Sequence, residues 1–270
     1  MTRMYRDLYN RISAACCYIT VFLDDEKISE GTGFAFRGDG QIITAAHVVT
    51  GRTPIRKEDY LDPNARIYVK FPERPVAQYR VLFCGLTIVV EALREPVQID
   101  LAMLAPVELS GAPYAHIPAR IKPPDLGDEV FLAGYSDELE LPFLVDQLLR
   151  PETQGAATFF EAMNKGYLAD MTGPLIKRGV IGNVRRIMAE NTREKVSLEC
   201  DVFFVDNSVH SGASGGPIVN TAGEAVGVIT KRAITSASQS EAPNLQIPSG
   251  ATIGLSLQPV ELMCRRSRNA

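Results

Sequence analysis

Residues 210–227 read HSGASGGPIVNTAGEAVG, and this stretch sets one serine, Ser214, between small residues on both sides. Glycines at 212, 215 and 216 allow backbone conformations that other residues rarely adopt, and they leave the flanks of the serine bare. The pattern predicts an exposed, rigidly aimed hydroxyl, which a nucleophile requires. The N–H groups of Gly212 and Ser214 are expected to point into one small space where an oxyanion would form.

The same stretch also fits an ordinary glycine-rich turn. Residues 217–220 are apolar enough for a strand, and residues 221–224, TAGE, have the composition of a hairpin turn. A serine hydroxyl needs an adjacent base before it can act as a nucleophile. The stretch alone therefore leaves both interpretations open.

Two further segments supply a base and a carboxylate. Of the three histidines, only His47 has a recognisable context, ITAAHVVTG, while His116 and His210 are interpreted as structural. Asp100 begins the apolar segment DLAML, where a buried carboxylate would need a hydrogen-bond partner. Each segment has a structural explanation of its own, but together the three favour a Ser-His-Asp group.

The composition is that of a globular chain. It has 270 residues, 46% of them hydrophobic and 22% charged, which is enough for one large core or two smaller ones. A net charge of −4 gives no electrostatic reason to expect nucleic acid or an anionic membrane as the main partner. Neither a metal nor a cofactor is expected.

The cysteines and the N-terminal residues indicate the cellular compartment of the protein. The five cysteines are an odd number at wide spacing, which indicates free thiols rather than a disulfide framework or a metal site. The first 22 residues are polar where a signal peptide is apolar, and no apolar run is long enough to span a membrane. A cytoplasmic protein is therefore expected, and a removed leader on a longer precursor stays open.

Short, β-branched stretches between Gly, Asp and Pro turns predict the fold class, an all-β dominated chain with two antiparallel six-stranded β-barrels. The first set of candidate strands lies at 15–23, 32–36, 41–44, 66–71, 80–93 and 101–104. The second set, after a proline-rich link at 117–125, lies at 129–134, 179–184, 197–205, 217–220, 225–230 and 251–257. We expect one barrel domain over 1–118 and another over 119–270.

Other segments depart from this pattern. Apolar residues four apart predict a short amphipathic helix at 4–12, and a short helix is also expected at the other end. Helical spacing predicts an inserted helical hairpin over 138–174. The Ser/Ala/Pro-rich residues 233–250 are interpreted as a mobile surface loop.

Five motifs, spread across nearly all of the chain, carry a family resemblance. They are GTGFAF (31–36), TAAHVV (44–49), DLAML (100–104), LGDEVFLAGY (126–135) and D-x(5)-G-x-SGGPIVN (206–220). With these motifs the chain resembles the chymotrypsin-like serine peptidases, and within them the HtrA/Deg-like branch. The order His, Asp, Ser is the order of that family.

The resemblance implies a catalytic triad. Ser214 would attack a peptide carbonyl, His47 would take the hydroxyl proton and return it to the leaving amine, and Asp100 would hold the imidazole tautomer. The N–H groups of Gly212 and Ser214 would form the oxyanion hole.

The resemblance also implies a substrate site. Strand 226–230 corresponds to the edge along which the family lays its substrate as an extra antiparallel strand. Ser208 lies where the first specificity pocket has its floor, and an uncharged floor argues against a preference for Arg or Lys. The substrate-binding candidates are Ser208, Thr230, Lys231 and Arg232. A charged pair at a strand end is also typical of a solvated surface, so the role of the last two stays open.

Two departures from the family pattern bear on regulation. Ala213 stands where trypsin-like zymogens carry an aspartate that pairs with a freed N-terminus, which argues against activation by that cleavage. Only residues 259–270 follow the last predicted strand, so the PDZ module expected after an HtrA-like peptidase is missing. Control is therefore expected from 138–174, from 233–250 or from a regulatory partner protein.

Two other functions remain as alternatives. A catalytically silent relative would use the double barrel as a binding or signalling module, although such relatives usually lose a triad residue and none is missing here. A hydrolase of small esters is disfavoured because the chain has no G-x-S-x-G elbow between a strand and a helix.

Overall fold

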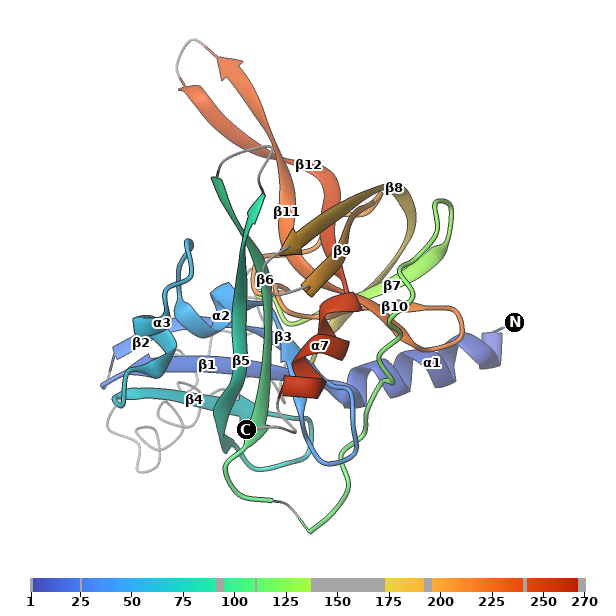
Figure 1. Ribbon diagram of the computed structural model, residues 1–270. Helices are drawn as coiled ribbons and strands as arrows, with labels where there is room; N and C mark the ends of the chain where they lie inside the picture. The colour runs from blue at the N-terminus through green and yellow to red at the C-terminus, as the bar shows by residue number, and fades with distance from the viewer. Residues whose placement is uncertain are drawn as a thin grey trace, which may run out of the picture.

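A computed structural model of the chain describes residues 2–24, 26–90, 95–109, 111–136, 173–191, 196–239 and 242–266. In these residues, twelve strands form two closed antiparallel barrels of six strands each (Figure 1). The predicted fold class, a chymotrypsin-like double barrel built mainly from strands, is confirmed.

The first barrel has the strand order β1-β2-β3-β6-β5-β4. Its strands are β1 (Cys16–Leu23), β2 (Glu26–Ala35), β3 (Ile42–Thr44), β4 (Ala65–Lys70), β5 (Ala77–Val90) and β6 (Glu95–Pro106). Two short helices, α2 (Ala46–Thr50) and α3 (Lys57–Leu61), lie between β3 and β4. All six predicted strands are confirmed, with β2 and β6 beginning several residues earlier than predicted.

The second barrel has the strand order β10-β11-β12-β9-β8-β7. Its strands are β7 (Glu129–Gly134), β8 (Leu175–Asn191), β9 (Val196–Val205), β10 (Pro217–Asn220), β11 (Ala225–Gln239) and β12 (Ala242–Ser256). The buried ring of Phe203 lies against Gly227 and Gly254, where a methyl group would come within 2.4 Å and 2.7 Å of it. Glycines on two neighbouring strands thus make room for one aromatic side chain in this core.

The prediction of a mobile loop at 233–250 was wrong. Residues up to Gln239 continue β11 and residues from Ala242 continue β12, and the two strands pair along this length. The ribbon extends well beyond the barrel (Figure 1). Serine and alanine are typical of loops, but here the barrel strands already fix the register, so each further cross-strand pair extends an existing ladder. Three register shifts lie along the pair.

The predicted helical hairpin at 138–174 lies almost wholly outside the described residues. Gly173 and Pro174, its last two residues, are described and lie in no regular element before β8.

Each terminal helix contacts the barrel at the other end of the chain. Helix α1 (Thr2–Ala15) confirms the predicted amphipathic helix, and its Tyr5 and Tyr9 rings lie 5.7 Å and 5.6 Å from the ring of Phe131 on β7. Helix α7 (Gln258–Arg266) reaches the first barrel, where Arg37 donates a hydrogen bond to the Cys264 sulfur at 3.4 Å. Each of the two helices therefore links the two barrels (Figure 1).

The link between the barrels changes partner within a few residues. The Ile117 N–H donates to the Ala35 carbonyl of β2 at 2.9 Å, and the Arg120 N–H donates to the Ala225 carbonyl of β11 at 2.8 Å. This change supports a domain boundary between residues 118 and 119, which stays a prediction.

All five cysteines are free thiols, and four of them are buried. Burial raises the pKa of the Cys200 thiol to about 11 and that of the Cys84 thiol to about 12. Among the helices that the structure describes, none has the length and apolar character needed to cross a membrane.

The packing around Phe203 predicts the effect of one methyl group. Gly227→Ala should lower the free energy of unfolding by about 1–3 kcal/mol, because the new methyl would meet the Phe203 ring and the Leu255 carbonyl. Chemical denaturation measures this change. Gly111→Ala, with nothing within 4 Å of the added methyl, is the matched control and should change stability by less than about 0.5 kcal/mol. Equal stability of the two variants would contradict the packing argument.

Candidate active site

His47 is positioned by a single turn of helix. Strand β3 ends at Thr44, and α2 begins two residues later with Ala46, so His47 follows directly from a buried strand. Gly51 ends the helix at a φ of 70°, and its N–H donates to the His47 carbonyl at 2.8 Å. This short segment holds the His47 backbone rigidly at the edge of the first barrel.

Asp100 contacts His47 through both carboxylate oxygens. Its Oδ1 accepts the His47 backbone N–H at 2.9 Å, and its Oδ2 lies 2.7 Å from the His47 Nδ1. The two side chains are 14% and 23% exposed. A carboxylate only accepts hydrogen bonds, so Nδ1 carries the proton and the neutral ring presents Nε2 as an acceptor. Asp100 lies within β6 rather than at its start, because the strand begins at Glu95.

Ser214 lies in the nucleophile loop, which we define as residues 210–216, between β9 and β10. The serine is half-buried, and its hydroxyl donates to the Thr230 carbonyl on β11 at 3.2 Å. No hydrogen bond between Ser214 and His47 is present among the described residues. The segments of His47 and Ser214 nevertheless both lie against Gly31 of β2. A methyl group added to Gly31 would lie 2.7 Å from Val48, the residue after His47, and 3.1 Å from the Ser214 carbonyl.

The nucleophile loop is seated against the first barrel by a close backbone contact. At Gly215, where φ is 87°, a side-chain carbon would lie 2.1 Å from the Thr32 carbonyl oxygen and 2.2 Å from the Thr44 hydroxyl. The Thr32 N–H also donates to the Ser214 carbonyl at 2.8 Å. Only glycine combines this backbone conformation with this approach.

Gly212 and Ser214 carry the two backbone N–H groups that were predicted to bind an oxyanion. Gly212 has a φ of 84°, and its carbonyl accepts the Thr32 hydroxyl at 2.8 Å. The Ala213 N–H donates to the His210 carbonyl at 3.3 Å. Within the part of the chain that the structure describes, the N–H groups of Gly212 and Ser214 donate to no other group, so they can serve a bound oxygen.

Ala213 contributes an apolar side chain to the second barrel. It is 4% exposed and packs in a cluster with Val130, Leu132 and Ile218. A methyl group therefore fills the position before the nucleophile, where the trypsin-like zymogens carry a carboxylate.

The predicted pocket residues lie in two places. Ser208 is half-buried, its carbonyl accepts the Lys177 amine at 2.6 Å, and its hydroxyl donates to the Val209 carbonyl. Thr230 lies on β11, where its carbonyl accepts the Ser214 hydroxyl. Lys231, exposed, and Arg232, half-buried, follow on the same strand. The structure thus joins Thr230 directly to Ser214, whereas no hydrogen bond among the described residues joins Ser208 to Ser214.

Thr32 is the main site residue that the sequence did not reveal. It is fully buried in β2, and its N–H and hydroxyl both bond to the nucleophile loop. The available signal was a hydroxyl residue between two glycines, Gly31 and Gly33, inside an apolar strand. A polar side chain at such a position needs a buried partner, although the sequence does not identify the partner.

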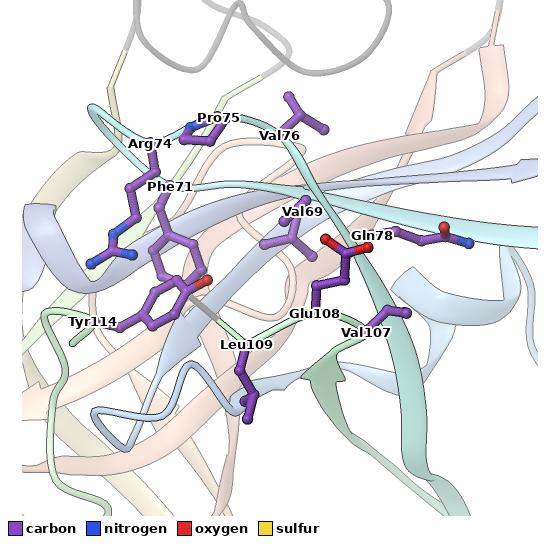
Figure 2. A pocket seen from close by; sticks show the side chains of 11 residues that line it. Val69, Phe71, Arg74, Pro75, Val76, Gln78, Val107, Glu108, Leu109 and Tyr114 are labelled. Carbon is purple, nitrogen blue, oxygen red and sulfur yellow. The ribbon is translucent and has the colours of Figure 1, made fainter. Parts of the chain in front are cut away.

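A cavity of about 430 Å³ at the β4–β5 turn contains none of these residues (Figure 2). Its walls include the Arg74 guanidinium, which stacks on the Tyr114 ring at 3.9 Å. A second cavity, of about 450 Å³, lies between α7 and the link after residue 117. Neither lining contains a serine or a histidine, and no cluster of metal-ligating side chains occurs among the described residues.

A family model described as a trypsin-like peptidase domain matches residues 31–228, which is more than half of the chain. The chain belongs to this family. This agrees with the resemblance that its sequence motifs carry. No curated protein matches the sequence.

Solved structures of two proteases share the fold of this trypsin-like peptidase domain. A serine endoprotease from Yersinia pestis has a TM-score of 0.55 at 17% identity, over 97% of this chain and 66% of that chain, just under two thirds. The active form of the Rv3671c protease from M. tuberculosis has a TM-score of 0.55 at 18% identity, over 98% of this chain and 85% of that chain. At these identities the likeness shows the fold.

The seat of the nucleophile loop generates a prediction for this trypsin-like peptidase. Gly215→Ala should reduce peptidase activity at least 100-fold, because a misplaced nucleophile loses the alignment that catalysis requires. The new side-chain carbon would overlap the Thr32 carbonyl. Assays on a peptide substrate, with circular dichroism to confirm folding, measure this effect.

Gly127→Ala is the matched control. Gly127 has a similar φ of 86°, but nothing lies within 4 Å of an added methyl group. This variant should lose about 1–2 kcal/mol of stability from backbone strain and keep its activity. If both variants kept full activity, the close contact at Gly215 would not be needed.

Proposed function

We propose that this peptidase cleaves peptide bonds of protein substrates through an acyl-enzyme formed on Ser214. The observation that supports this most strongly is the pairing of Asp100 with both the backbone and the ring of His47. That pairing leaves Nε2 as the basic atom of the ring, on a helix that lies beside the nucleophile loop. The HtrA/Deg-like branch stays a prediction.

In the proposed reaction, the Ser214 hydroxyl turns from the Thr230 carbonyl toward His47 Nε2. Its oxygen then bonds to the carbonyl carbon of the substrate as the proton moves to Nε2. The carbonyl oxygen becomes an oxyanion and accepts the N–H groups of Gly212 and Ser214. Collapse breaks the C–N bond, and His47 gives its proton to the leaving amine. Water then attacks the ester by the same route and releases the acid.

Asp100 would act on the ring rather than on the substrate. Its Oδ2 keeps the proton of neutral His47 on Nδ1 and stabilises the imidazolium that forms during each step. Its Oδ1 holds the backbone of α2 at the same time. One carboxylate therefore fixes both the tautomer and the position of the base.

The substrate is proposed to lie along β11. This strand pairs with β10 only between residues 225 and 228, while its pairing with β12 continues to Gln239. From Thr230 onward, no other described strand pairs with its second edge, so an extended peptide can add to it through backbone hydrogen bonds. Lys231 and Arg232 would flank that peptide. An uncharged Ser208 near the pocket argues against a preference for Arg or Lys.

Regulation and compartment remain predictions. Control by 138–174 rests on residues that lie almost entirely outside those described, and 233–250 consists mainly of paired strand rather than a loop. A regulatory partner is a prediction of the same kind. A cytoplasmic location is proposed because the chain carries five free thiols, which a reducing compartment preserves.

The nucleophile is tested by Ser214→Ala. This change removes one hydroxyl from a loop of small residues, so the fold should persist while turnover falls by about 10⁶-fold. Labelling with a fluorophosphonate probe and hydrolysis of a protein substrate are the measurements. Full activity of the purified variant would refute the assignment. A wild-type chain that takes no label would instead fit the silent binding module.

The third member of the triad is tested by Asp100→Asn. The amide can donate to Nδ1 and so favours the wrong tautomer, which should lower kcat by about 10⁴-fold. The melting temperature should change little, because an amide of the same shape still accepts the His47 backbone N–H. Turnover equal to that of the unchanged protein would transfer this role to another group.

A further inference from the structure

Thr32 belongs to the first barrel, but its hydroxyl bonds to two residues of the second half of the chain, Gly212 and Tyr135. The side chain is fully buried, and its hydroxyl donates to the Gly212 carbonyl at 2.8 Å. We infer that this hydroxyl is a positioning group, which holds the Gly212–Ala213 peptide so that the Gly212 N–H can meet the oxyanion. This inference rests on the proposed function, in which that N–H is a catalytic donor.

Within the described part of the chain, the Gly212–Ala213 peptide has one anchor outside its own loop. Its N–H, from Ala213, bonds to His210, which belongs to the same nucleophile loop and moves with it. Its carbonyl bonds to Thr32 on a barrel strand. Gly212 has no side chain to restrict rotation, so without the outer anchor the peptide can turn. Only the φ and ψ angles of Gly212 separate its N–H from that carbonyl, so fixing the carbonyl restricts the directions that the N–H can take.

A second bond fixes the direction of the Thr32 proton. The hydroxyl oxygen accepts the backbone N–H of Tyr135, directly after β7, at 2.9 Å. A hydroxyl has one proton to donate, and with Tyr135 on the acceptor side that proton is directed to Gly212. One oxygen thus joins β2, the end of β7 and the nucleophile loop. Valine has the shape of threonine and makes neither bond, whereas serine can make both.

The chain contains a matched control at Thr252. This residue on β12 is also fully buried, and its hydroxyl donates to the Asn207 carbonyl at 2.6 Å and accepts the Val209 N–H at 3.0 Å. The bonds are of the same kind as those of Thr32, but they hold the segment around Ser208. Loss of the Thr252 hydroxyl should therefore disturb the pocket rather than the oxyanion donors.

The experiment compares Thr32→Val, Thr32→Ser and Thr252→Val with the unchanged protein. The measurements are kcat and KM on one peptide substrate, the melting temperature, and the affinity for a peptide aldehyde, which forms an oxyanion on the enzyme. Both valine variants should lose a similar amount of thermal stability, because each removes the partner of one part-buried carbonyl and of one buried N–H.

The kinetic effects should differ. Thr32→Val should lower kcat by about 10- to 100-fold with KM changed less than about threefold, since one oxyanion donor is worth about 10²- to 10³-fold in other enzymes. Aldehyde affinity should fall by a similar factor, and Thr32→Ser should restore most of both. Thr252→Val should act mainly on KM.

Two results would overturn the inference: full kcat in folded Thr32→Val, or equal losses of kcat in the two valine variants, which would indicate a purely structural role. Undiminished turnover in Ser214→Ala would instead refute the proposed function itself, so the two failures can be told apart.

Discussion

The nucleophile loop lies where two backbones leave no space for a side chain. A side-chain carbon on Gly215 would meet the Thr32 carbonyl of the first barrel at 2.1 Å, and one on Gly216 would meet the Ala133 carbonyl of the second at 2.0 Å. Adjacent glycines are thus pressed against different barrels. The position of Ser214 relative to His47 depends on this double contact, because the serine precedes the two glycines directly and the histidine lies just after β3.

The candidate site therefore has one part that lies within a single barrel and another part that is brought to it by contacts between the barrels. His47 and Asp100 both belong to the first barrel and bond to each other within it. Ser214 and the proposed backbone donors come from the second half of the chain. Their position relative to His47 depends on contacts between the two barrels, chiefly the bonds of Thr32 to Ser214 and Gly212. Catalytic groups of this kind need positions fixed to within a fraction of an ångström, and buried hydrogen bonds provide that precision.

Much of the fold could be predicted because its signals are local. Alternating apolar residues and glycine turns gave all twelve strands, and the contexts of His47, Asp100 and Ser214 indicated the site. The length of β11 and β12 was missed, since residues such as Ser236 and Ala237 have loop-like composition and are held in strands by register with Gln246 and Leu245. Thr32 was missed because its partner Gly212 lies 180 residues away, and no local pattern encodes such a pairing.

Because each terminal helix packs on the other barrel, the two helices affect the order in which the site can assemble during synthesis. Helix α1 is made before the second barrel but packs on its strand β7, and α7 is made after both barrels but contacts Arg37 of the first. During synthesis, the first barrel can form while α1 still lacks its partner. The loop that carries Ser214 can take its place only after β10 to β12 have been made. Helix α7 can contact Arg37 only after that. In the proposed function, a nascent chain without its second barrel would hold His47 and Asp100 but would not yet present Ser214, so it would be inactive.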